Sequence, residues 1–293
     1  MPSLFCSFES MLSIDPKELS VPVLQKYLQN AIAPRPICFA STISKNGEPN
    51  LAPFSFFNLF SSNPPIAVFS PAYSGRTGAP KDTLLNVQEV PECVINMVNY
   101  NMVQQTSLAS SPFPKGVNEF EKAGFTPLAS DLIKPFRVKE SPVQLECKVV
   151  EIKELGKNGG AGNLVICEVI RIHISEEVLN AENQIDTHKI DLVARMGDNW
   201  YCRAQGDALF EVKKPITSIG VGYDAIPDSI KHSKVLTGNN LGLLGSIEQV
   251  PTNDEVKAYR ESLKNFAGEE ERHLFAQSLL EANRVKEAWM VLL

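Results

Sequence analysis

Two basic residues lie just before a predicted helix and could together bind a phosphate. Arg76 is in a loop rich in Gly, Ser and Pro (residues 71–80), and Lys81, Asp82 and Thr83 lead into the helix. Free N–H groups at a helix start, the helix dipole and a threonine hydroxyl all favour a bound anion. The sequence therefore predicts a phosphate site, with the alternative that Asp82 or Thr83 caps the helix and Arg76 is solvated.

A neighbouring predicted strand combines aromatic rings with small polar groups. Ser55 and Asn58 stand among Phe54, Phe56 and Phe57. Flat rings with a few hydroxyl and amide groups suit a flat heteroaromatic ligand that has a polar edge. The same phenylalanines could equally be ordinary core residues.

Other catalytic motifs are missing or out of context. Residues 220–225 match G-x-G-x-x-A, but Pro227 interrupts the helix that a dinucleotide fold requires, so we interpret them as a loop. The glycines of residues 156–162 lack the ending of a P-loop and predict a hairpin tip. No H-E-x-x-H, C-x-x-C or G-x-S-x-G pattern occurs, so we predict neither a metal site nor covalent hydrolase chemistry. His173 is expected at the surface.

Hydrophobic periodicity predicts a β-rich fold with a few helices. Predicted helices cover residues 21–32 and 102–109, and another begins at 81–83. Roughly seven short strands separated by turn signals favour an antiparallel barrel over a doubly wound α/β sheet. The predicted strands span residues 37–43, 50–60, 65–70, 92–98, 143–149, 164–174 and 192–203.

The composition changes near residue 206, which predicts two regions. Residues 1–205 form the predicted barrel domain, and residues 206–293 form a linker and a helical C-terminal extension. The linker is expected to end near Pro251. Apolar stripes in residues 256–266 and 275–289 then predict helices that dock against the barrel rather than a free tail.

Composition and charge exclude several classes of protein. Hydrophobic residues make up 43% and charged residues 21%, as in soluble globular proteins. The net charge of -6 gives no electrostatic reason to bind nucleic acid or an anionic membrane. The six cysteines, Cys6 included, are scattered, and several lie in apolar strand-like runs where Cys acts as a small hydrophobe. With no long apolar run and no signal-peptide pattern at the N-terminus, a cytoplasmic protein is expected.

In order along the chain, these motifs resemble the flavin reductase-like FMN-binding split-barrel family, including its flavoredoxin-like branch. The resemblance implies a mainly β fold, an antiparallel Greek-key split barrel of six strands with peripheral helices, and a homodimer that binds FMN near the subunit interface. The matching segments are A-P-R-P-I at 33–37, S-T-I at 41–43, A-P-F-S-F-F-N at 52–58, K-D-T at 81–83 and A-R-M-G with a later Tyr at 194–201.

The resemblance also implies which residues bind FMN. Ser41, Thr42, Ser55 and Asn58 would line the flavin and its ribityl chain, whereas the phosphate would be held by Arg76, Lys81 and Thr83. No catalytic side chain is expected, because the flavin performs the redox chemistry. Arg195 and Tyr201 match family positions without a clear role. The full predicted set is Arg35, Ser41, Thr42, Ser55, Phe56, Phe57, Asn58, Ser70, Arg76, Lys81, Asp82 and Thr83.

The implied activity is hydride transfer from NADH or NADPH to flavin. One departure affects it: many flavin reductases of this group carry a His, associated with the nicotinamide, where this chain has Asn163. A non-enzymatic FMN-binding electron-transfer protein is therefore the first alternative. The second is an antiparallel barrel that binds another ligand.

Overall fold

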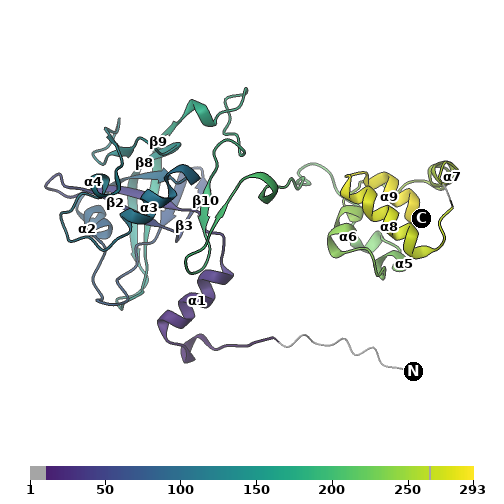
Figure 1. The fold of residues 1–293 in the computed structure, drawn as a ribbon, viewed down its shortest axis with the longest axis horizontal. Helices are drawn as coiled ribbons and strands as arrows, with labels where there is room; N and C mark the ends of the chain where they lie inside the picture. The colour runs from purple at the N-terminus through teal and green to yellow at the C-terminus, as the bar shows by residue number, and fades with distance from the viewer. Residues whose placement is uncertain (1–10, 264) are drawn as a thin grey trace. The chain divides into compact units, whose positions relative to one another are not determined.

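The computed structural model describes residues 11–263 and 265–293, so Cys6 and the N-terminal segment discussed above lie outside the described residues. The chain divides into two compact units between Phe210 and Glu211 (Figure 1), where the sequence predicted a boundary between residues 205 and 206. Among the described helices, none is long and apolar enough to cross a membrane.

The first unit is built on a seven-stranded antiparallel sheet with the strand order β2-β1-β5-β8-β9-β4-β3. Its strands are β1 (Cys38–Ile43), β2 (Pro49–Phe54), β3 (Phe57–Ser62), β4 (Pro65–Phe69), β5 (Glu92–Met97), β8 (Val143–Glu154) and β9 (Asn163–Ile174). Two small sheets pair β6 (Pro127–Leu128) with β7 (Arg137–Val138), and β10 (Val193–Arg195) with β11 (Tyr201–Arg203). The α-helices are α1 (Val21–Ala31), α2 (Asp82–Glu89), α3 (Val103–Ala109) and α4 (Glu119–Ala123).

The two edges of the large sheet meet at Ser55 and Phe56. Strands β2 and β3 form opposite edges, yet only these two residues join them. Three steps of about 3.8 Å keep the Cα atoms of Phe54 and Phe57 within about 11 Å of each other. The sheet therefore curls round on itself at this corner, and the predicted antiparallel split barrel is confirmed.

Two predicted strands were wrong in extent. The single strand predicted for residues 50–60 is β2 and β3, because the chain passes from one sheet edge to the other at its middle. This is why the sheet has seven strands rather than six. The strand predicted for residues 192–203 is a hairpin of β10 and β11, whose turn includes Asp198 in a left-handed conformation with φ 49°.

Strand β1 is buried on both faces. Because successive side chains of a strand point to opposite sides, Cys38 and Ala40 join the barrel core with Leu84 of α2. Phe39 joins the cluster around α3 and α4, where its ring lies 5.1 Å from that of Phe125. The barrel core thus has α2 on one side of β1, and the site residues of α2 are held against the sheet.

Four cysteines pack in the barrel core as small hydrophobes, as predicted. Cys38, Cys93, Cys147 and Cys167 are fully buried and free. Burial raises the pKa of the Cys38 thiol well above its ordinary value. The Cys38 thiol therefore stays protonated and serves packing.

The second unit is a helical domain with a core of its own. Trp289 is completely buried at its centre and donates from Nε1 to the Leu244 carbonyl oxygen at 2.8 Å. The linker predicted to reach Pro251 was wrong, because Ile230 and Leu244 belong to this core. The helices are α5 (Asp228–Lys231), α6 (Gly238–Gly245), α7 (Asn253–Glu261), α8 (Glu269–Glu281) and α9 (Val285–Leu292).

The apolar stripe of residues 275–289 is divided between two helices. Asn283, with φ 57°, turns the chain between α8 and α9. Leu279 and Trp289 of this stripe are buried in the core of the second unit, so the stripe packs against other residues of its own unit. Docking of this unit against the barrel stays a prediction.

The G-x-G-x-x-A motif is a loop, as predicted. Gly220 lies against α6, where an added Cβ would overlap the Gly245 carbonyl oxygen. The backbone N–H groups of Val221 and Gly222 donate to Ile247 and Gly245 at 2.7 and 3.0 Å. The glycines therefore permit close backbone packing inside the second unit.

Candidate functional site

Four buried polar side chains join β1, β2 and the start of α2. Asn50 Nδ2 donates to Thr42 Oγ1 at 3.1 Å and to Thr83 Oγ1 at 2.9 Å. Asn86 Nδ2 also donates to Thr42 Oγ1, at 3.1 Å. All four residues are less than a tenth exposed. The structure thus brings together the predicted Thr42 and Thr83, and adds Asn50 and Asn86, which the predicted FMN-binding set did not include. Asn50 is nevertheless one of the residues that match the family pattern.

The start of α2 has no side-chain cap. Lys81 is the N-cap residue, and no side chain accepts a hydrogen bond from the first turn. The Thr83 hydroxyl is bound by Asn50 instead, so the alternative that Asp82 or Thr83 merely caps this helix was wrong. The N–H groups at the start of α2 remain available to a bound anion.

The loop of residues 71–80 holds Arg76 at an exposed turn. The Ser74 N–H donates to the Ala79 carbonyl at 2.9 Å, and the Gly78 N–H donates to the Ser74 carbonyl at 2.8 Å. Among the described residues, neither Arg76 nor Lys81 forms an ion pair. Both charges are therefore available to a ligand.

The same loop is hydrogen-bonded to the turn of the β8–β9 hairpin and to Asn163, the first residue of β9. The Tyr73 N–H donates to Ala161 at 2.9 Å, and the Gly160 N–H donates to Tyr73 at 3.0 Å. Asn163, which is 2% exposed, donates from Nδ2 to the Pro71 carbonyl at 3.0 Å. Asn163 therefore fixes the loop that carries Arg76.

The aromatic strand adjoins this loop. Ser70, which is buried, donates its N–H to the Phe56 carbonyl at 2.8 Å, and Phe57 pairs with Phe69. The phenylalanines have different environments: Phe54 is buried in the barrel core, Phe57 packs against it half-buried, and Phe56 is 43% exposed. Of these three phenylalanines, Phe56 is thus the one most accessible to a ligand.

Three other predicted residues, Asn58, Ser55 and Ser41, differ in their exposure. Asn58 is exposed, and its Oδ1 accepts the Leu59 N–H at 2.8 Å. Ser55 is half-buried at the corner between β2 and β3. Ser41 is fully buried on β1, and its hydroxyl has no hydrogen-bond partner among the described residues. A buried hydroxyl without a hydrogen-bond partner is uncommon in folded proteins.

Arg35 is used for another purpose. Its guanidinium donates to the carbonyl oxygens of Ile32 at 2.6 Å and Met196 at 2.8 Å, and also to that of Gln29. Its backbone forms a bridge with Arg195. Arg35 therefore ties the end of α1 to the end of β10, and these bonds leave it little capacity for a cofactor.

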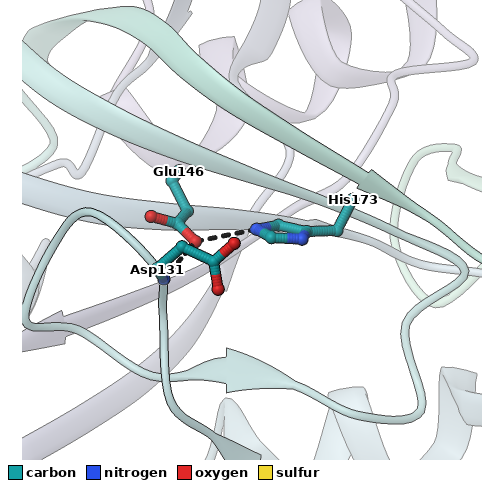
Figure 2. A group of neighbouring side chains, drawn as sticks. All are labelled: Asp131, Glu146 and His173. Carbon is teal, nitrogen blue, oxygen red and sulfur yellow. Dashed lines mark hydrogen bonds and ion pairs between the residues drawn. The ribbon is translucent and has the colours of Figure 1, made fainter.

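A separate cluster of titratable groups is formed by Glu146 on β8, His173 on β9 and Asp131 (Figure 2). The fully buried Glu146 carboxylate accepts the N–H groups of Asp131 and Leu132, both at 2.8 Å, and contacts His173 Nε2 at 2.7 Å. The His173 side chain is only 19% exposed, so its predicted surface position was wrong. Arg137 lies 3.8 Å from the Asp131 carboxylate.

The contacts of this cluster indicate a structural role. His173 Nε2 and both Glu146 oxygens already have hydrogen-bond partners, and Arg137 balances Asp131. Burial raises the pKa of the Glu146 carboxyl, but its hydrogen bonds from Asp131, His173 and Leu132 outweigh burial and lower the pKa. The cluster holds the 131–132 turn on the sheet.

Comparison with known proteins covers the first unit. The Flavin reductase like domain family matches residues 31–189. An uncharacterized protein of Aquifex aeolicus is 34% identical over 197 residues, which are 67% of this chain and 97% of that protein. Nitrilotriacetate monooxygenase component B from Bacillus cereus has 30% identity and a TM-score of 0.65, over 69% of this chain and 99% of that one. A putative flavin reductase with a split barrel domain from Shewanella frigidimarina has 25% identity and a TM-score of 0.58, over 68% and 95%.

Proposed function

Because the chain belongs to the flavin reductase-like family, we propose that it is an FMN-binding oxidoreductase that transfers hydride from NADH or NADPH to flavin. The observation that carries the proposal is the uncapped start of α2 beside Arg76 and Lys81. Two unpaired cations and free backbone N–H groups form a phosphate site in a chain whose net charge is -6.

The residues of the site fit this cofactor. Arg76, Lys81 and the first N–H groups of α2 would hold its phosphate. The Thr42, Asn50, Thr83 and Asn86 network fixes the position of α2 on the sheet, and Phe56 offers an exposed ring to a flat ligand. When bound, FMN supplies the redox chemistry by accepting hydride at its N5 atom, so the chain needs no general base.

A non-enzymatic FMN-binding electron-transfer protein is the second candidate. The observation that favours it is Asn163, whose amide is buried and bonded to the Pro71 carbonyl. This side chain cannot also reach a nicotinamide without breaking that bond. Steady oxidation of NADH or NADPH by the FMN-loaded protein supports the reductase, and its absence supports the carrier.

Replacing Arg76 with Gln tests the phosphate assignment. We expect the wild-type protein to bind FMN more tightly than riboflavin, and Arg76→Gln to weaken FMN binding on the order of tenfold to a hundredfold by removing a charge-assisted hydrogen bond. Riboflavin affinity should not change. Fluorescence titration with both flavins measures this, and Lys122→Gln, an exposed cation on α4, is the control. Equal affinities of the wild type for FMN and riboflavin would contradict the assignment.

We also propose that the protein is a homodimer in the cytoplasm. Three large apolar side chains of the barrel unit are exposed, Leu59 by 61%, Phe60 by 69% and Ile172 by 56%. Exposed apolar surface of this kind marks interfaces, and two-fold pairing is the commonest arrangement. The described cysteines are all free, which fits a reducing compartment.

Sedimentation of the FMN-loaded protein checks the dimer. We expect a dimer for the wild type and a shift toward monomer for Phe60→Asp, because an unpaired charge in an apolar interface is costly. A wild-type protein that sediments as a monomer with FMN fully bound would overturn the proposal.

A further inference from the structure

A cavity of about 410 Å³ lies between α3 and the β10–β11 hairpin, and its lining is basic and aromatic. Arg195 and Tyr201 line it from the hairpin, and Gln104 lines it from α3. The volume suits a ligand with one ring. The flavin assignments above use none of these side chains.

The two arginines of the cavity differ in their partners. Arg203 lies over the Tyr100 ring at 3.7 Å and binds Asp191 through two 2.7 Å hydrogen bonds, so its charge is balanced. Arg195 lies over the Tyr201 ring at 4.6 Å and donates one bond, to the Asp198 carbonyl at 2.7 Å. Within the described parts of the chain, no carboxylate lies within 4.0 Å of Arg195, so its charge is unpaired.

Arg35 does not line the cavity, but its backbone pairs with that of Arg195 and it adds a second positive charge next to it. It is 7% exposed, its Nε has no hydrogen-bond partner among the described residues, and its backbone is bonded to that of Arg195. Burial first, and the charge of Arg195 second, lower the pKa of Arg35. Two guanidinium groups without a carboxylate thus raise the local potential, and a bound anion would lower it.

From this arrangement we infer that the cavity binds a small planar organic anion of the aromatic carboxylate class. The Arg195 guanidinium has free donors in the fork geometry that matches a carboxylate. The flat faces of the Arg195–Tyr201 and Arg203–Tyr100 stacks suit an aromatic ring. The Gln104 amide offers a further polar contact. This site goes beyond the proposed flavin chemistry and does not depend on it.

Benzoate and its neutral analogue benzamide are the probes that test the site. We expect calorimetric titration of the full chain to show benzoate binding at least about tenfold more tightly than benzamide, because only benzoate pairs with Arg195. Arg195→Gln should reduce benzoate affinity to that of benzamide. Arg171→Gln, which removes an exposed arginine from β9, should leave benzoate binding unchanged.

Titrations with and without saturating FMN locate the binding. Benzoate affinity that is the same in both conditions supports a separate site, and loss of benzoate binding when FMN is bound would place it in the flavin site and overturn the inference. Equal binding of benzoate and benzamide by the wild type, or no benzoate binding, would also overturn it. Because the comparison of benzoate with benzamide uses the wild-type protein without FMN, it holds even if Arg195→Gln does not fold or if the protein does not bind FMN.

Discussion

Replacing Trp289 with Ala is expected to unfold the C-terminal unit while the barrel unit stays folded. Trp289 is completely buried among the helices of its own unit and bonds to the Leu244 carbonyl. Removing a buried Trp side chain typically costs about 3–5 kcal/mol. A unit of about 80 residues has a total stability on the order of 4–12 kcal/mol, so the loss is a large fraction of this stability.

Limited proteolysis and calorimetry of the full chain measure this effect. Cleavage of Trp289→Ala should be confined to the region after Phe210, and FMN titration should give the wild-type affinity. Trp200→Ala is the matched control, because Trp200 is 75% exposed and its removal should change stability by less than about 0.5 kcal/mol. A single transition in which both units unfold together at a lower temperature would contradict independent units.

Replacing Glu146 with Ala is expected to destabilise the barrel unit by about 2–5 kcal/mol. The change leaves the N–H groups of Asp131 and Leu132 and the ring of His173 without their buried acceptor. Glu146→Gln keeps one acceptor oxygen and should cost less. Asp131→Asn, at a side chain that is 49% exposed, is the control and should have little effect.

The pH dependence gives a second readout for Glu146. Its hydrogen bonds hold the pKa of the folded carboxyl below the ordinary value, so the unfolded state binds more protons in this range. The stabilisation is present above the ordinary carboxyl pKa and is lost as the pH falls through the lower folded value. Urea unfolding from pH 7 to pH 3 should show this loss in the wild type and less of it in Glu146→Gln. An identical acid dependence in the two proteins would show that Glu146 is not the group involved.

The strands of the barrel could be predicted because an alternation of apolar and polar residues indicates that one face of a strand is buried. This alternation did not show that the other face of β8 is covered as well. Gln144 and Glu146 have the spacing of solvent-facing residues, yet both are buried, because the segment around β7 and the side chain of His173 lie over them. A period-2 pattern cannot distinguish a solvated polar face from one that is satisfied by a distant segment.

The proposed phosphate site rests on residues that are near one another in sequence. Arg76 is in the loop that precedes α2, and Lys81 is the N-cap residue of that helix. Asn50 could have been paired with Thr42 from the hairpin register, and Asn86 lies one turn after Thr83. Their shared network was missed because each residue alone also suits a turn or a helix surface.

The sequence by itself determined the family and the β-rich pattern and supplied the residues proposed to bind a phosphate, since these depend on residue types and short spacings. The tertiary structure alone decided that residues 50–60 divide between two sheet edges, that Arg35 bonds to backbone carbonyls, and that Asn163 holds the Pro71 loop. The tertiary structure also decided that the apolar stripe around Trp289 packs into a core within its own unit. Each of these depends on contacts between residues distant in sequence, which form only when the chain has folded.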